Sequence, residues 1–352
     1  MYRVRCNVLL RVPPLANFHG KRNGWPAKGH ADSIESGALH GAAVRRYSSG
    51  MNDGLFDVLI AGGGPAGLQA ALTLGRALKR VLVADGGSRR NAPADHMNNF
   101  VSRDCIAPAD FRREARAQLA KYPNVSFRDG PIDTITGRRG DFRTGAVRAR
   151  RVLLATGLID QPPEFENLAP LWGHSVFQCP YCHGWEAGKR RWGYYAPDAT
   201  NPHVGPFVIL LRGWSAEVTL FTDKIGDDMR SRLLAAKIQI ESAAVTRLVG
   251  TGHQLEAVEL VDGRRVPCEA LLMHPPQKQV DLVRALGVAL DDEGFVKTDP
   301  MTRETSIPGI YAAGDLATRG QAAIFAAAAG MQAAAAINVE LTADLVASGT
   351  LP

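Results

Sequence analysis

The sequence has few cysteines and no long run of strongly hydrophobic residues. Five of its 352 residues are cysteine, an odd number and too few for a secreted domain held together by disulfides, so we expect a reducing compartment. The most apolar stretch, residues 321–338, is mostly alanine and contains polar side chains. It predicts a buried helix of a soluble domain rather than a membrane span, and we expect no membrane partner.

The sequence also lacks an excess of charge outside its first 50 residues. Eight of the 41 Lys and Arg residues lie at positions 1–50 against two acidic residues, which accounts for the whole net charge of +6. The remaining chain has 33 residues of each sign. It therefore predicts no nucleic-acid partner.

Residues 1–50 are Arg-rich and acid-poor, and they show no pattern of a folded element. This composition resembles a mitochondrial transit peptide, although a start codon placed too early, with Met51 as the true first residue, is the simpler interpretation. We expect a disordered extension at 1–50 in either case. We also expect a cytoplasmic protein, unless the extension directs the chain to the mitochondrial matrix.

Residues 56–86 predict a strand, a glycine-rich turn, a helix and a second strand. The turn reads GGGPAG, which fits G-x-G-x-x-G, and Asp85 follows the last glycine by 18 residues. In such a unit the glycines permit a tight turn, approach of a pyrophosphate and close helix packing, while the acid binds ribose hydroxyls. The predicted contacts to a dinucleotide are Gly62, Gly64, Pro65, Ala66, Gly67, Asp85 and Gly86.

Two later segments indicate which dinucleotide is bound. Residues 150–157, RRVLLATG, and residues 306–315, SIPGIYAAGD, each predict a buried strand that ends in small residues. In flavoproteins with two dinucleotide-type domains, the aspartate of GD binds a ribityl hydroxyl of FAD, and the next helix points at the flavin. The predicted cofactor is therefore FAD, with further contacts from Ala155, Thr156, Gly157, Gly314, Asp315, Gln321 and Ala322.

The segment between these two regions, residues 166–279, has apolar strands of its own and contains a C-x-x-C pair. This order predicts an α/β fold with two Rossmann-like, three-layer (ββα/αβα) dinucleotide-binding domains. The FAD domain is discontinuous, with parts at 51–165 and 280–352. The smaller NAD(P)-type domain is inserted at 166–279.

The pair belongs to the string CPYCH at 179–183, which has several known uses. A C-x-x-C near a helix start favours a thiolate, with a pKa of about 7 or lower, and His183 can carry a proton at neutral pH. Zinc would need a second ligand pair. Haem attachment belongs to exported chains, and a structural pair of buried cysteines is a further alternative. We predict a redox dithiol at Cys179 and Cys182, with His183 as a catalytic residue and no metal.

The combination of GGGPAG, ATG, an inserted C-x-x-C and AAGD resembles the low-molecular-weight thioredoxin reductase family. RNAPADHMNNF (90–100) and CPYCHGWE (179–186) are similar to a subgroup that includes the dithiol oxidases of gliotoxin and holomycin biosynthesis. The resemblance implies that Cys182 is the flavin-side sulfur and that Cys179 exchanges with substrate. It also implies flavin-side contacts from Arg90 and Asn91, and a homodimer.

The insert lacks the second glycine fingerprint that a thioredoxin reductase needs for NADPH. Counting back from Trp214 places this loop at 199–204, ATNPHV, which has no glycine. Asp223 stands where basic residues would bind the 2′-phosphate, and a carboxylate repels a phosphate. NADPH is therefore doubtful as a cofactor.

We expect electrons to pass from a dithiol substrate through Cys179 and Cys182 to FAD, and from there to oxygen as peroxide. The expected substrate is a small dithiol or a thioredoxin-like protein. Two alternatives stay open. One is an NADPH-dependent thioredoxin reductase with an atypical nicotinamide loop, and the other is a non-catalytic, FAD-binding redox sensor.

Overall fold

Strand β1 (Phe56–Ala61) lies inside a large sheet, as its sequence predicts. Five of its six side chains are buried, and nearly continuous apolar runs of this kind are typical of strands that are covered on both faces. It pairs in parallel with β2 (Val81–Asp85) on one side and with β6 (Val147–Leu154) on the other. The carboxyl ends of these strands therefore meet at one edge.

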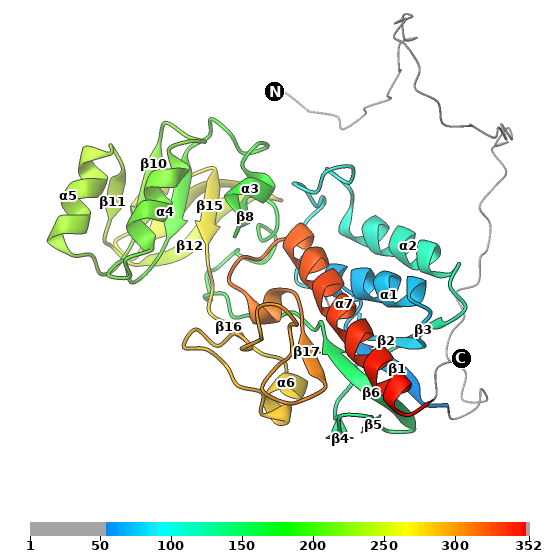
Figure 1. Ribbon diagram of the computed structural model, residues 1–352. Coiled ribbons are helices and arrows are strands. Elements are labelled where there is room, and N and C mark those ends of the chain that lie inside the picture. The colour runs from blue at the N-terminus through cyan, green and yellow to red at the C-terminus, as the bar shows by residue number, and fades with distance from the viewer. Residues whose placement is uncertain (1–53, 88, 350–352) are drawn as a thin grey trace, which may run out of the picture. The chain divides into compact units, whose positions relative to one another are not determined.

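The computed structural model in Figure 1 describes residues 54–87 and 89–349. The extension predicted at 1–50 lies outside the described residues. The sheet that contains β1 has seven strands, and we call the part of the chain built on it the main lobe. Its strand order is β3 (Val125–Asp129), β2, β1, β6, β5 (Asp141–Thr144) and β4 (Thr136–Arg138), with β17 (Ile310–Ala312) also paired to β6.

Two apolar cores cover the two faces of this sheet. One core contains buried residues of α1 (Pro65–Arg76), α2 (Pro108–Leu119) and α7 (Ala323–Ala347). The other contains residues of α6 (Asp281–Leu286) and the segment 295–296. The sheet is thus the middle layer of an α/β arrangement.

Helix α7 packs closely on α1 because its facing residues are small. A Cβ atom on Gly330 would collide with the backbone of Ala66. Among the described residues, α7 is the one helix long and apolar enough to cross a membrane, and 44% of its apolar window is buried. The sequence predicts a buried helix, whereas the structure buries one side of it. The exposed side carries Ile324, Phe325, Met331, Val339 and Val346.

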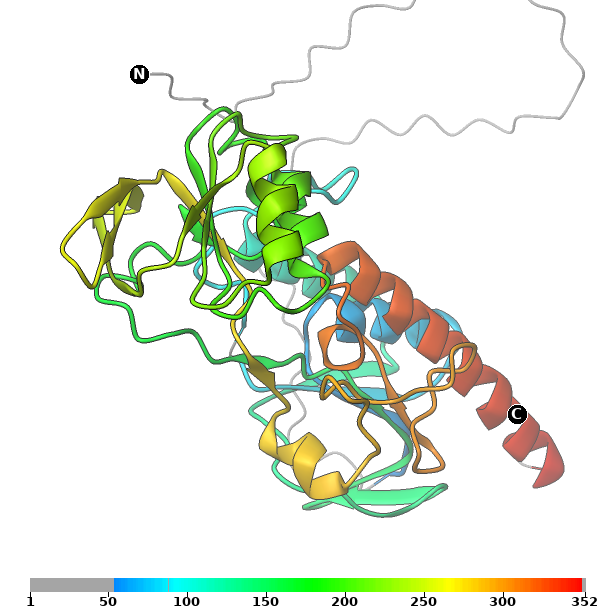
Figure 2. The same cartoon turned by 90° about the vertical axis from the view of Figure 1, so that its left-hand side faces the viewer.

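A second sheet, of five parallel strands between residues 176 and 273, lies at the centre of the part of the chain that we call the inserted lobe. Helices α4 (Val204–Leu211) and α5 (Asp227–Ala235) pack on one face of this sheet. Figure 2 shows these helices in green and the antiparallel strands of the other face in yellow. The predicted α/β fold with two Rossmann-like sheets is confirmed. The parallel strands are β8 (Val176–Phe177), β9 (Trp192–Tyr195), β10 (Val218–Phe221), β11 (Gln239–Glu241) and β15 (Ala270–Met273), and the antiparallel ones are β12 (Val245–Thr251), β13 (Gln254–Leu260) and β14 (Arg265–Pro267).

The chain enters and leaves the inserted lobe through two short strands that pair with each other. These are β7 (Ile159–Asp160) and β16 (Gln277–Lys278), which run antiparallel. In Figure 1 this crossover lies between the main sheet and the inserted sheet. Side chains on these strands can therefore contact residues of both lobes.

We expect Gly330→Ala to lower the free energy of unfolding by about 1–3 kcal/mol, because the added methyl group meets backbone that cannot move aside. Alanine's higher helix propensity, worth about 1 kcal/mol, opposes this loss only in part. Urea unfolding measures the difference. The control is Gly226→Ala, where the added Cβ meets nothing within 4 Å. A Gly330→Ala protein as stable as the wild type would contradict the close packing.

Candidate functional site

The glycine turn between β1 and α1 is shaped for a phosphate. Gly62 has a φ of +114°, and a Cβ atom there would collide with the carbonyl oxygen of Ala155, while one on Gly67 would collide with the carbonyl of Gly62. A Cβ atom on Gly64 would meet nothing within 4 Å. The first and third glycines are thus required by packing, and the second leaves free space at the amino end of α1, where a pyrophosphate binds.

Asp85 ends β2 beside this turn and is buried. Its carboxylate accepts a hydrogen bond from the backbone N–H of Gly87 at 3.2 Å and forms an ion pair with Arg89. A Cβ atom on Gly63 would collide with the same carboxylate, so the middle glycine, which the sequence did not single out, is needed as well. Asp85 borders a pocket of about 350 Å³ that suits the adenosine end of a dinucleotide. The pocket is lined by Asp85, Gly86, Gly87, Arg89, Arg112, Arg116, Asp129 and Gly130.

The predicted residues of the other two segments come to the same edge of the main sheet. The backbone N–H of Ala155 donates to the carbonyl of Ala61 at 2.8 Å, which brings the ATG turn, with Thr156 and Gly157, against the end of β1. Gly314 has a φ of +95°, and a Cβ atom there would lie 3.2 Å from the Cβ of Ala66. The three motifs therefore form one continuous site along the carboxyl ends of β1, β6 and β17.

Asp315 follows Gly314 and starts a short 3₁₀ helix, η1 (Asp315–Ala317). Its carboxylate lies 3.4 Å from Nη2 of Arg90. Burial raises the pKa of Asp315, and the positive charge of Arg90 opposes that rise. Among the other predicted contacts, Gln321 and Ala322 are partly buried just before α7, whereas Asn91 is exposed.

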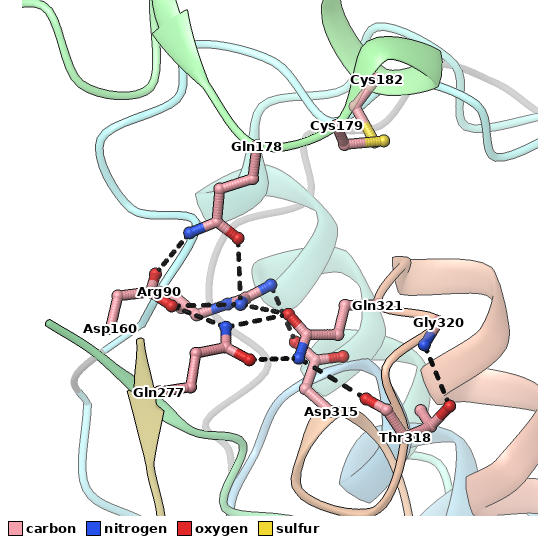
Figure 3. Close-up of polar contacts among 10 residues, drawn as sticks. All are labelled: Arg90, Asp160, Gln178, Cys179, Cys182, Gln277, Asp315, Thr318, Gly320 and Gln321. Atoms are coloured by element: carbon pink, nitrogen blue, oxygen red, sulfur yellow. Dashed lines mark hydrogen bonds and ion pairs between the residues drawn. A yellow bond between two sulfur atoms is a disulfide. The ribbon is translucent and has the colours of Figure 1, made fainter. Parts of the chain in front are cut away.

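A network of side-chain hydrogen bonds connects this site to the segment that precedes the cysteine pair (Figure 3). Nη1 of Arg90 lies 3.3 Å from Asp160 and donates to Oε1 of Gln178 at 3.2 Å. Gln277 donates to Asp160 at 2.7 Å, and Gln321 donates to Gln277 at 2.7 Å. The sequence pointed to Arg90 and Gln321, but no motif marks the other three residues.

Cys179 and Cys182 form a disulfide, with their Cα atoms 5.3 Å apart. Cys179 is the N-cap of the single-turn helix α3 (Pro180–His183), and both cysteines are partly exposed. The side-chain amide of Asn98 donates to the carbonyl oxygen of Cys182 at 2.8 Å. Asn98 belongs to the string RNAPADHMNNF, so a residue of the main lobe holds the helix that carries the disulfide.

His183 lies directly after Cys182, and its ring stacks on Phe177 with centroids 4.8 Å apart. Its Nδ1 is buried and has no hydrogen-bond partner among the residues that the structure describes. Burial lowers the pKa of His183, and the negative charge of Glu186 opposes this effect. The ring is therefore neutral at pH 7 and can accept a proton, as the predicted role requires. Within the described ranges, no group of three or more His, Cys, Asp and Glu side chains could hold a metal.

The loop after β9 shows that the predicted register of the nicotinamide site was wrong. The backbone N–H of Ala196 donates to the carbonyl of Phe221 at 3.0 Å, just as Gly62 donates to Ala84 at 2.8 Å in the main lobe. The first glycine position therefore corresponds to Ala196, while the second, which in the main lobe is Gly64 at the N-cap of α1, corresponds to His203 at the N-cap of α4. Counting back from Trp214 failed because α4 begins only at Val204, after a longer loop.

The side chains of this loop bind its own backbone N–H groups. The Asp198 carboxylate accepts hydrogen bonds from the backbone N–H of Thr200 at 3.0 Å and from its hydroxyl at 2.5 Å, and these bonds lower the pKa of Asp198. Oδ1 of Asn201 accepts from the backbone N–H of His203 at 2.9 Å. An ionised carboxylate thus lies in the loop that stands in place of the glycine turn, between β9 and the amino end of α4.

The comparisons with known proteins agree with this geometry. The sequence profile of the pyridine nucleotide-disulphide oxidoreductase family matches residues 56–201 and 203–335. This chain belongs to that family. It is therefore an FAD-dependent oxidoreductase that acts on sulfur groups, and the residues of the main lobe fit FAD at the glycine turn, the adenosine pocket and Asp315.

Similar proteins include thioredoxin reductases of fungi. Thioredoxin reductase sirT of Leptosphaeria maculans is 30% identical over 324 residues, which cover 84% of this chain and 98% of the relative. Thioredoxin reductase aclD of Aspergillus oryzae is 33% identical over 311 residues, 82% of this chain and 98% of the relative. The solved structure of an oxidoreductase from Agrobacterium tumefaciens is 34% identical and has a TM-score of 0.75. The match covers 82% of this chain and 99% of the chain in that structure. The resemblance to thioredoxin reductases is confirmed.

The neutral state of His183 generates a pH prediction. Because its pKa is lowered, the ring becomes protonated only below the ordinary value of 6.5. We expect the rate of dithiol oxidation to fall on the acid side at a pH below 6.5, and His183→Gln to remove this limb together with most of the rate. The exposed His253 supplies the control variant His253→Gln, which should keep the limb. A His183→Gln enzyme with an unchanged pH–rate profile would exclude this role.

Proposed function

We propose that this protein oxidises dithiols to disulfides and passes the electrons through FAD to oxygen, with no need for NADPH. The observation that carries this proposal is the loop between β9 and α4, which has no glycine from residue 196 to residue 204 and carries the ionised carboxylate of Asp198. In the main lobe, a Cβ atom on Gly64 would meet nothing within 4 Å. The main lobe therefore leaves room for a phosphate at the amino end of its helix, whereas the corresponding loop of the inserted lobe has no such glycine turn, which favours electrons that enter from sulfur.

The disulfide between Cys179 and Cys182 is the group that accepts these electrons. One thiolate of the substrate attacks Cys179, so that a mixed disulfide forms and Cys182 leaves as a thiolate. The second substrate thiol then attacks the mixed disulfide, which releases the oxidised substrate and leaves both cysteines reduced. His183, neutral and adjacent, accepts a proton from the attacking thiol.

FAD, when bound, would supply the two-electron redox chemistry by which the reduced cysteine pair is reoxidised and oxygen becomes hydrogen peroxide. The net reaction is a dithiol plus oxygen giving a disulfide plus hydrogen peroxide. The protein holds FAD through its glycine turn, and Asn98 keeps Cys182 in place by binding its carbonyl oxygen. The residues of this chain thus bind the cofactor, orient the cysteine pair and move protons.

The relatives imply a dithiol or a thioredoxin-type substrate in general, and we propose a small dithiol. Two aromatic side chains of the cysteine motif have much of their surface exposed, Tyr181 at 61% and Trp185 at 88%. Flat apolar groups of this kind suit a compact organic dithiol. The second candidate function is the opposite reaction, reduction of a thioredoxin, because the similar fungal proteins are thioredoxin reductases.

Aerobic turnover with reduced dithiothreitol tests the proposal. We expect the wild-type flavoprotein to consume oxygen and to release one peroxide for each disulfide formed, without NADPH. Cys182→Ser should keep its bound FAD and lose turnover, because without Cys182 there is no disulfide for the substrate thiolate to attack. Normal turnover by Cys182→Ser would refute the mechanism, and a wild-type protein with bound FAD but no turnover would favour a redox sensor.

We also propose that the protein forms a homodimer through the exposed side of α7. Its apolar residues recur along the helix for its whole length, and contiguous exposed apolar surface of this kind marks an interface. Small residues lie between the large ones, so that two copies of the helix can approach closely about a twofold axis.

Light scattering after size-exclusion chromatography tests the dimer. We expect Val339→Glu to give a monomer, because it places a charge in the centre of the paired stripes. Val261→Glu is the matched control, since Val261 of the inserted lobe is 67% exposed and Val339 is 69% exposed. A monomeric wild type, or a Val339→Glu protein that stays dimeric, would contradict this interface.

A further inference from the structure

Gln178, the residue before Cys179, uses its side chain both as a hydrogen-bond donor and as an acceptor. The Nε2 amide of Gln178 donates to Oδ2 of Asp160 at 2.8 Å, and its Oε1 accepts from Nη1 of Arg90 at 3.2 Å. Its backbone carbonyl accepts from the ring of His274. Both polar atoms of the side chain are therefore bonded (Figure 3).

These partners come from both lobes. Arg90 belongs to the main lobe and Asp160 to the crossover strand β7, while His274 directly follows β15 of the inserted lobe. The Nδ1 atom of His274 bonds with the hydroxyl of Tyr194 at 3.0 Å.

The charges of the partners permit one orientation of the Gln178 amide. Its donor end faces a carboxylate and its acceptor end faces a guanidinium, and hydrogen bonds to charged groups are the stronger kind. Rotation of the amide by half a turn would place its N–H₂ group against Arg90 and its oxygen against Asp160. Both contacts would then be repulsive. The side chain is thus held in one position, and the peptide that leads into Cys179 is held with it.

We propose that Gln178 is a positioning residue for Cys179, the sulfur that exchanges with substrate. This inference rests on the proposed dithiol chemistry and adds a link between the cysteine pair and the FAD site. Arg90, which binds Gln178, also pairs with Asp315 at 3.4 Å and contacts Gln321. Arg90 therefore lines the flavin end of the main lobe and also binds Gln178, the side chain that orients the sulfur of Cys179.

Reversing the polarity of one hydrogen bond tests the proposal. Gln178→Glu alone places a second carboxylate against Asp160. Asp160→Asn alone removes the charge that orients the Gln178 amide. In the double substitution Gln178→Glu/Asp160→Asn, the new amide at position 160 can donate to the new carboxylate at position 178. The number of charges is unchanged, and Arg90 still faces a carboxylate.

The first measurement is kcat and KM for reduced dithiothreitol, with the FAD content of each variant. We expect each single substitution to lower kcat about tenfold or more with a smaller change in KM, and the double substitution to recover most of that loss. Gln118→Glu, on the exposed face of α2, is the control and should match the wild type. A simple loss of fold would not be repaired by the second substitution.

The second measurement does not need catalysis or bound FAD. In the dithiothreitol-reduced protein, the rate of Cys179 alkylation by iodoacetamide is followed against pH by mass spectrometry. We expect its midpoint to shift in each single variant and to return in the double variant. If the wild type does not oxidise dithiols but the alkylation pattern holds, the proposed function fails while the positioning role stands. Single variants that behave as the wild type in both assays, or a double variant no better than the singles, would overturn the positioning role.

Discussion

The function depends on how closely a phosphate can approach the first turn of a helix. Free backbone N–H groups bind a phosphate only where neither a side chain nor a negative charge is in the way. In the main lobe, Gly64 leaves this space open at the amino end of α1. In the inserted lobe, the loop before the amino end of α4 has no glycine turn and carries Asp198, whose carboxylate accepts a hydrogen bond from the backbone N–H of Thr200. The two lobes therefore differ in the room that they leave for a phosphate.

This difference assigns a task to each lobe. The main lobe fits the cofactor, while the inserted lobe carries the disulfide, and we propose that no nicotinamide supplies electrons there. The crossover strands β7 and β16 join them, and Asp160 on β7 is bonded both to Gln277 on β16 and to Gln178 beside the disulfide. The cofactor site and the sulfur pair are thus parts of one hydrogen-bonded network. In this network, the side chain of Gln178 links Arg90 to the residue next to it, Cys179.

Much of the site was predictable because its chemistry imposes strict local requirements. A turn that touches a phosphate needs glycine at Gly62 and Gly67, and such positions leave a recognisable spacing in the sequence. The register of the inserted loop was predicted wrongly because loop length between β9 and α4 leaves no such mark. Asp160 and Gln178 were not predicted because their importance arises from contacts across the crossover, which depend on how the chain folds back rather than on any local pattern.

The most direct test of the central claim is anaerobic reduction of the oxidised flavoprotein, followed by the absorbance of the flavin after rapid mixing. With oxygen absent, the only electrons available come from the added reductant. We expect reduced dithiothreitol to bleach the flavin, and a large excess of NADPH to leave its spectrum unchanged over the same time. Rapid bleaching by NADPH would show that the inserted lobe does accept a nicotinamide dinucleotide, and would contradict the assignment of electrons to sulfur.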